Sequence, residues 1–296
     1  MADFPVSSLN LFLTAPHSTV TLQRLTRLLL TTSIGLLLGT SAVQANDVTL
    51  PKGQRSLEVR QTQGKVTYKG SRPRPAQSGD RLSAGQGLTT GPRSSAVVGI
   101  DSNIGIVKVA EKTDFTVRNL TIAADGGRVT LLTVYRGQVA LQVRPFTNKG
   151  SRLEVKTPSG IAGVRGTEFG VAVSPQGRTA ILTNEGTVSA EAQGQSILVG
   201  AGYSSLIYPG EPPTPARPTV EDLSLKLKTA DAYRSGLVRV GGHVDPINTV
   251  IYENQELEVA RDGSFHLESS TQQRNWATIV VRTPLGNEKI HTIWLR

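Results

Sequence analysis

The stretch of sequence that decides the fold is LEVKTPSGIAGVRGTEFGVAV, residues 153–173. It begins with a strand pattern and continues through Thr157-Pro158-Ser159-Gly160 into a short apolar connector. At its end Phe169, Val171 and Val173 alternate with small or polar residues, and this period of two is typical of a strand with one buried face. We therefore predict a strand, a turn bounded by proline and glycine, a connector and a second strand.

A repeated glycine–valine step occurs on both sides of this stretch. It is found at Gly64-x-Val66, Gly137-x-Val139 and Gly186-x-Val188. In each step we expect the glycine to supply a turn or bulge and the valine to return to the core face. The spacings are unequal, so they do not indicate a strict repeat array. With 30 glycines and few aromatic residues in the chain, the pattern predicts an all-β fold with short turns.

The run from Val155 through Thr157-Pro158 to Val164-Arg165-Gly166-Thr167-Glu168-Phe169 resembles the signature of the FecR domain, a periplasmic domain of many bacterial envelope proteins. The likeness continues upstream in a Gly79-Asp80 turn, a strand ending in Thr90-Gly91 and an apolar strand at residues 95–100. Asp101-Ser102-Asn103 departs from the family's usual Gly-Ser pair, which puts only the turn type in doubt. The resemblance implies a twisted, solenoid-like FecR β-domain, which we expect at residues 46–208.

The same resemblance supplies the candidate site residues. They are Thr157, Pro158, Val164, Arg165, Gly166, Thr167, Glu168 and Phe169. We expect them to be mainly structural, with partner contact as a second role. Arg165 could grip a carboxylate of a partner or of a glycan. The alternative, which we favour, is that Arg165 pairs with Glu168 or caps turn carbonyls.

The amino terminus has the pattern of an export signal. Arg24 and Arg27 precede an uncharged apolar run from Leu28 to Val43, which ends in Val43-Gln44-Ala45. A basic flank, a short apolar region and a small-residue site are typical of a signal peptide, which we predict at residues 1–45. The alternative is a retained membrane anchor, which needs about 20 apolar residues to cross a bilayer.

The charge balance favours anionic partners outside the cytoplasm. The chain has 32 basic and 23 acidic residues, and removal of Asp3, Arg24 and Arg27 leaves a net charge of +8. For a periplasmic or secreted protein, we expect an envelope protein or an anionic glycan as partner, and no nucleic acid. Contact with the membrane would occur only through an uncleaved amino-terminal segment. The charges are spread along the chain, which is also typical of an ordinary solvated surface.

A proline-rich segment divides the remaining chain. Five prolines lie between residues 209 and 218, so we predict an extended, semi-rigid linker at residues 209–220 that forms neither helix nor ladder. Residues 221–296 show six or seven short strand patterns, which suit a small β-sandwich. The order Gly242-x-Val-Asp-Pro246, Leu257-x-Val259 and Asp262-Gly263-x-Phe265 resembles bacterial immunoglobulin-like modules.

No catalytic or cofactor motif is apparent. The chain has no cysteine, no nucleophile elbow, no zinc-protease motif and no phosphate loop, so we expect neither an enzyme nor a cofactor. His243, His266 and His291 lack the short spacing of metal ligands, and we expect them to be solvated. Trp276 and Trp294 could form a glycan platform, but core or edge packing is the interpretation we favour.

These observations predict a non-enzymatic exported envelope protein with a binding, scaffolding or sensing role. The alternative is a periplasmic component of a cell-surface signalling system, since some members of the resembled family are similar to membrane-spanning regulators that restrain a sigma factor. About 24 residues precede the apolar run here, too few for a folded cytoplasmic domain. We therefore expect no direct control of a sigma factor.

Overall fold

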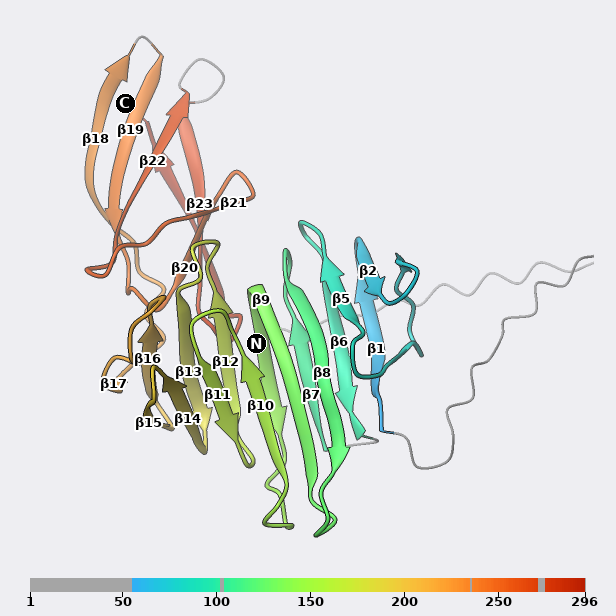
Figure 1. Ribbon diagram of the computed structural model, residues 1–296. Helices are drawn as coiled ribbons and strands as arrows, with labels where there is room; N and C mark the ends of the chain where they lie inside the picture. Colours follow the sequence, from blue (N-terminus) through green and yellow to red (C-terminus); the bar gives the residue numbers. More distant parts are fainter. Residues whose placement is uncertain (1–54, 102–103, 235, 271–274, 296) are drawn as a thin grey trace, which may run out of the picture. The chain divides into compact units, whose positions relative to one another are not determined.

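The computed structural model describes residues 55–101, 104–234, 236–270 and 275–295 (Figure 1). Within these ranges the chain forms β-strands and turns and no α-helix, so the predicted all-β class is confirmed. None of the described segments is a helix of the length and apolarity that a membrane crossing requires. The predicted signal peptide lies outside the described residues. The described residues belong to one compact unit, bounded at Leu50 and Arg296.

The first part of this unit is a sandwich of two sheets, which we call the first sandwich. Its strand pairs are antiparallel except for β9 and β10. One sheet contains, in order, β4 (Arg81–Leu82), β1 (Leu57–Gln63), β6 (Ser95–Ile100), β7 (Gly105–Val109), β9 (Arg128–Val143), β12 (Glu168–Val173), β13 (Thr179–Glu185), β16 (Tyr203–Ile207) and β17 (Arg217–Pro218). The other contains β3 (Arg74–Pro75), β2 (Val66–Lys69), β5 (Gly87–Thr90), β8 (Asp114–Ile122), β9, β10 (Arg152–Lys156), β11 (Ile161–Val164), β14 (Thr187–Ala192) and β15 (Gln195–Gly200).

The long strand β9 belongs to both sheets and joins them. Its first half pairs with β8 and, in parallel, with β10, and its second half pairs with β7 and β12. Strand β9 changes sheet after a β-bulge. Asp114 of β8 lies opposite Arg136 and Phe115 lies opposite Val134, so Tyr135 is the extra residue of β9. Such a bulge bends a strand and re-aims its side chains.

The glycine–valine steps behave as predicted. Gly64, Gly137 and Gly186 have φ values of 71°, 85° and 78°, which L-residues rarely adopt. The paired valines at positions 66, 139 and 188 are at most 4% exposed. At Gly137 a Cβ atom would lie 2.5 Å from the Cα atom of Thr113, so β9 also needs glycine at this position for close backbone approach.

The core of the first sandwich lies between its two sheets. Its largest fully buried side chains are those of Leu57, Leu82, Leu88, Ile100, Phe115, Leu132, Leu141, Leu153, Phe169 and Ile181. The predicted face of Phe169, Val171 and Val173 is buried here, at 0%, 0% and 1% exposure. Because the strands alternate in side-chain direction, each sheet contributes every second residue to this core.

The residues after the linker form a second sandwich with its own core. One sheet contains β18 (Lys226–Arg234), β19 (Leu237–His243) and β22 (Ser264–Ser270), and the other contains β21 (Gln255–Leu257), β20 (Thr249–Tyr252), β23 (Trp276–Arg282) and β24 (Glu288–Trp294). Phe265, Ile279 and Val250 are among the buried residues between them. The second sandwich thus has seven strands, where six or seven were expected, while the immunoglobulin-like assignment stays a prediction. The first of these strands begins at Lys226.

The prediction of a linker that forms no ladder is wrong. Arg217 and Pro218 pair with Ser204 and Tyr203 as strand β17. Upstream, Thr214 donates its backbone N–H to Leu206 O at 2.8 Å and accepts a hydrogen bond from the Leu206 N–H at its side-chain oxygen. Proline is tolerated in this ladder because β17 is an edge strand, where one side needs no donor. The segment thus lies along β16 instead of spanning open solvent.

Candidate binding cleft beside the two sandwiches

Thr157 and Pro158 form the turn that the signature predicted. Thr157 is 5% exposed, and its backbone N–H and hydroxyl both donate to Gly160 O, at 2.8 and 3.0 Å. Its hydroxyl oxygen also accepts a hydrogen bond from Thr179 on β13 at 2.8 Å. Pro158 is exposed at the tip of the turn. These bonds fasten the turn between β10 and β11 to the other sheet, which is a structural role.

The second half of the signature carries the chain from one sheet to the other. Val164 ends β11, and Phe169 lies in β12 and is fully buried. Between them Gly166 has a φ of 135°, and a Cβ atom there would lie 2.3 Å from the Cα atom of Pro145. Thr167 is buried, and its carbonyl accepts a hydrogen bond from the Val143 N–H at 2.9 Å.

Arg165 and Glu168 are both occupied by contacts within the chain, and not with each other. The Arg165 Nη2 donates to the backbone carbonyls of Asn148 and Lys149. Glu168 accepts a hydrogen bond from the Asn184 side chain at 3.1 Å. The geometry therefore favours the carbonyl-capping alternative for Arg165, and its contact with a partner stays a prediction.

The aromatic and histidine candidates in the second sandwich do not converge on one site. Trp276 and Trp294 lie opposite each other on β23 and on the edge strand β24, and Trp294 is 63% exposed. His291 contacts the Leu223 carbonyl at 2.8 Å, while His243 and His266 lie on β19 and β22. Within the described ranges, no group of three His, Cys, Asp or Glu side chains could hold a metal ion.

Buried polar contacts connect the first sandwich to the second. Gln138 on β9 is 4% exposed and donates from Nε2 to the carbonyls of Thr283 and Pro284, at 2.8 and 3.0 Å. Arg178, 7% exposed, donates to the carbonyls of Pro246 and Asn248. Burial lowers the pKa of Arg178, because the charged guanidinium loses water there. A hydrogen bond from a charged donor such as Arg178 is stronger than one between neutral groups. The contacts of Gln138 and Arg178 therefore stabilise the packing of the second sandwich on the first.

Apolar contacts at the same interface bury the second face of β12. Ala172 packs with Ala180, Leu206 and Ile247, the last of which belongs to the second sandwich. At Gly170 a Cβ atom would lie 2.0 Å from the Pro284 carbonyl oxygen. The alternation of this strand predicted a single buried face, whereas the structure buries both because the second sandwich covers the other one.

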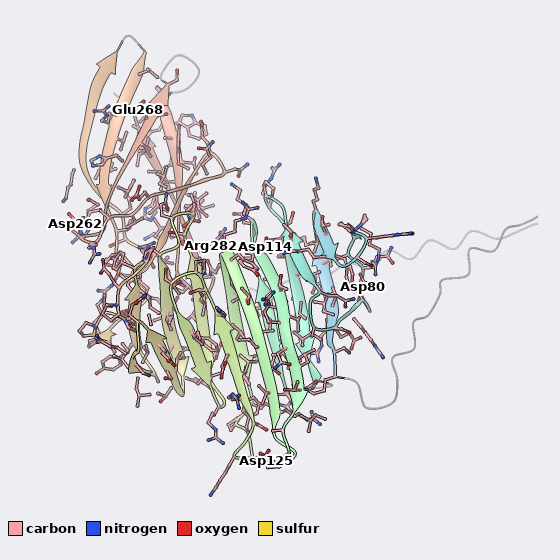
Figure 2. All side chains as sticks on the ribbon, in the orientation of Figure 1. Asp80, Asp114, Asp125, Asp262, Glu268 and Arg282 are labelled. Atoms are coloured by element: carbon pink, nitrogen blue, oxygen red, sulfur yellow. The ribbon has the colours of Figure 1, made fainter. Side chains whose placement is uncertain are left out.

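Arg282 extends the interface as a partly buried ion pair. Its guanidinium lies 2.8 Å from Glu111 Oε1. The other carboxylate oxygen of Glu111 accepts a hydrogen bond from the Arg93 N–H at 2.6 Å. Burial acts to raise the pKa of Glu111, but the hydrogen bonds from Arg93 and Arg282 outweigh it and hold that pKa below its usual range. In Figure 2 the labelled Arg282 and Asp114 lie toward one end of the first sandwich, and Asp125 marks the opposite end.

A cleft of about 640 Å³ opens next to this interface. Its floor includes Thr67 on β2 and Thr89 on β5, and Gln255 and Glu256 of β21 border it from the second sandwich. The volume is within the range of about 300–1,000 Å³ that is typical of ligand sites. None of the eight signature residues lines it.

The cleft carries more positive than negative charge. Lys65, Lys112 and Arg136 line it, and Glu256 is its one acidic lining residue. Lys112 is half-buried and has a φ of 52°, because it occupies the tight turn between β7 and β8. The next residue, Thr113, accepts a hydrogen bond from the Gln138 N–H at 2.9 Å, which connects Lys112 to the interface network.

Glu256 is the group with the largest change in acidity at this site. Burial raises its pKa to about 7, although Arg178, Arg282 and Lys112 act in the opposite direction. It also lines a cavity of about 30 Å³ with Gln138, whose Oε1 is buried and has no hydrogen-bond partner among the described residues. Near neutral pH the side chain of Glu256 therefore changes between a neutral acid and a partly buried carboxylate.

Sequence reasoning did not find this cleft, because its residues are far apart in the chain. Lys65 directly follows Gly64, and Arg136 directly precedes Gly137. This position beside a glycine of the glycine–valine steps was the only local signal. The contribution of Glu256 depends on how the two sandwiches pack. No periodicity within either segment contains that information.

One comparison with known proteins matches part of the first sandwich. Residues 86–189 match the family described as FecR protein. This match confirms the resemblance drawn from residues 155–169. Among functionally characterised proteins, none matches the chain significantly.

Solved structures show only distant likeness. Two crystal structures of a candidate anti-sigma factor from Parabacteroides distasonis align with 44% of this chain and 58% of that one, at 13% identity and a TM-score of 0.37. A polysaccharide lyase aligns with 81% of this chain and 39% of its own, at 11% identity and a TM-score of 0.18. The chain thus spans less than two thirds of the length of these proteins.

Proposed function

We propose that this chain, whose residues 86–189 match the FecR family, is an exported, non-enzymatic binding protein of the cell envelope, periplasmic or secreted. The single observation that carries the proposal is the cation-lined cleft beside a hydrogen-bonded interface between two sandwiches. Hydrogen bonds between the two modules position the cleft residues before a ligand binds, and such preorganisation lowers the ordering cost of binding.

The lack of catalytic motifs and the predicted export signal support the same proposal. A hydrolase acting on glycans would need two carboxyl groups placed across a scissile bond. The cleft has one acidic lining residue, Glu256. The basic mature chain suits anionic partners, either an envelope protein or a glycan.

The proposal is tested on the tagged protein in its native cells. We expect the protein in the periplasm or medium, with a mature amino terminus near Asn46 by mass spectrometry. We also expect it to retain an envelope protein or glycan in a pull-down, both as wild type and as Arg165→Ala, because Arg165 caps carbonyls of its own chain. An intact amino terminus in the membrane fraction, or hydrolysis of envelope glycans lost on changing one carboxylate, contradicts the proposal.

A signalling role is the second candidate function, and the FecR match is the observation that favours it. In this case the chain would serve as the periplasmic component of a cell-surface signalling system. The pull-down separates the two candidates. Recovery of an outer-membrane receptor or a membrane-bound regulator supports signalling, whereas recovery of glycan without such proteins supports binding alone.

A further inference from the structure

We propose that the cleft binds an acidic saccharide, whose carboxylates are held by Arg136, Lys65 and Lys112. The inference rests on the proposed binding function and assigns it a ligand class and a place. The cleft holds about 640 Å³, which exceeds the space needed by a single carboxylate or phosphate ion and suits a ligand of several rings.

The three cations are available to a ligand. Lys65 and Arg136 are exposed and Lys112 is half-buried. Within the described part of the chain, their side chains form no hydrogen bond or ion pair, in contrast to Lys69, which bonds to Asp114. The planar guanidinium of Arg136 matches a carboxylate in a bidentate arrangement, and the two ammonium groups add point charges nearby.

The floor of the cleft favours a saccharide over an extended acidic peptide. A peptide would bind by adding a strand to an open sheet edge. Thr67 already pairs with Thr89 on one side and Pro75 on the other, and Thr89 also pairs with Asp114. Among the described strands, β3 and β21 lie at the edges of their sheets, and they have only two and three residues. What the floor offers instead are the hydroxyls of Thr67 and Thr89, which match sugar hydroxyls as donors and acceptors.

Glu256 makes this binding depend on pH. The charged groups around it are Arg178 between β12 and β13, Lys112 and Glu111 from the β7–β8 turn, Arg282 on β23 and Glu258 next to β21. A bound anion disfavours the ionised form of Glu256, so the protonated form binds more tightly. Affinity for an acidic saccharide therefore rises as the pH falls through about 7.

The test uses the exported protein, purified with a carboxyl-terminal tag, and calorimetric titration with tetragalacturonate at low salt. The matched probes are neutral maltotetraose, hexaglutamate and inorganic phosphate. We expect tetragalacturonate to bind, and the double variant Arg136→Gln/Lys65→Gln to weaken it at least about tenfold. The control variants Lys108→Gln and Arg118→Gln, both exposed and outside the cleft, should change affinity less than about threefold. Equal melting temperatures show that all variants fold.

Several results overturn the proposal. Equal binding of hexaglutamate and tetragalacturonate would assign the cleft to acidic peptides, and equal binding of phosphate would reduce it to a simple anion site. Binding that the double variant leaves unchanged would place the saccharide elsewhere. In Glu256→Gln the pH dependence of affinity between pH 5.5 and 8 should flatten. If no saccharide binds while the pull-down still recovers an envelope partner, the ligand assignment fails and the proposed function stands.

Discussion

Phe169 and Gly166, three residues apart, stabilise the first sandwich by different physical means. Phe169 contributes buried apolar area at the centre of the core, with no exposed surface. Gly166 has no side chain, and this leaves room for Pro145, whose Cα atom would lie 2.3 Å from a Cβ atom at position 166. Both residues belong to the signature, and neither contacts the cleft.

Replacing Phe169 by alanine should lower the free energy of unfolding by about 3–5 kcal/mol, because it removes a buried ring and leaves a cavity. Chemical denaturation of the purified protein measures this loss. Tyr203→Ala, at a position 41% exposed, is the matched control and should cost much less. Equal losses for the two variants would mean that Phe169 is not in the core.

Replacing Gly166 by alanine should destabilise the protein by more than 1 kcal/mol, because a Cβ at a φ of 135° would also meet the backbone of Pro145. The control is Gly200→Ala, where the added Cβ meets no atom within 4 Å. There alanine should be neutral or stabilise by about 0.4–1 kcal/mol. Thermal melting compares the two, and a stable Gly166→Ala protein would refute the steric argument.

At the scale of single elements, a strand's surroundings decide what its pattern means. Strand β12 has the alternation of a half-buried strand and is buried on both faces, because the second sandwich packs on Gly170 and Ala172. Strand β17 contains proline and still forms a ladder, because it lies at an edge. The three-residue strand β21 brings Glu256 to the cleft.

Glu256 should make stability depend on pH. Its pKa in the folded protein is about 7, above the usual value of 4.5, so the folded state binds the proton more tightly than the unfolded state. This group's contribution is therefore fully present below pH 4.5 and is lost as the pH rises through about 7. Wild type therefore loses stability between pH 5 and 8, and Glu256→Gln does not. The melting temperature of the variant minus that of wild type should rise over this range, by about 2–4 °C for each kcal/mol of stability that wild type loses.

The control for this titration is Glu58→Gln, an exposed carboxylate on β1 in the first sandwich. Its difference from wild type should stay nearly constant over the same range, because this variant keeps Glu256 and the groups around it. A constant difference for Glu256→Gln as well would contradict the burial of the carboxyl group.

At the scale of the molecule, the interface decides whether the two sandwiches unfold as one. Arg178→Met should leave the carbonyls of Pro246 and Asn248 without their donor, at a cost of about 1–3 kcal/mol for each buried group. We expect one calorimetric transition for the wild type and an earlier, separate transition of the second sandwich in the variant. Arg152→Met, which breaks only an exposed pair with Glu154, should leave the single transition unchanged. Two separate wild-type transitions would contradict this coupling.

Local patterns accounted for much of the fold and for little of the candidate site. The glycine–valine steps were predictable because a positive φ and a buried valine depend only on neighbouring residues. Arg165 stood out in the sequence as a charge within a signature, and the structure shows it donating to carbonyls of its own chain. The cleft residues gave no such signal, because Lys65, Arg136 and Glu256 come together only through packing.

The sequence by itself determined the all-β class, the turn at Thr157–Gly160, the buried face of Phe169 and the resemblance to FecR over residues 155–169. These features follow from side-chain period and backbone preference, which act over a few residues. The tertiary structure alone decided the change of sheet along β9, the ladder of the proline segment, the second buried face of β12 and the cation-lined cleft. Each of these depends on contacts between residues distant in the chain, and a local pattern does not specify which surfaces meet.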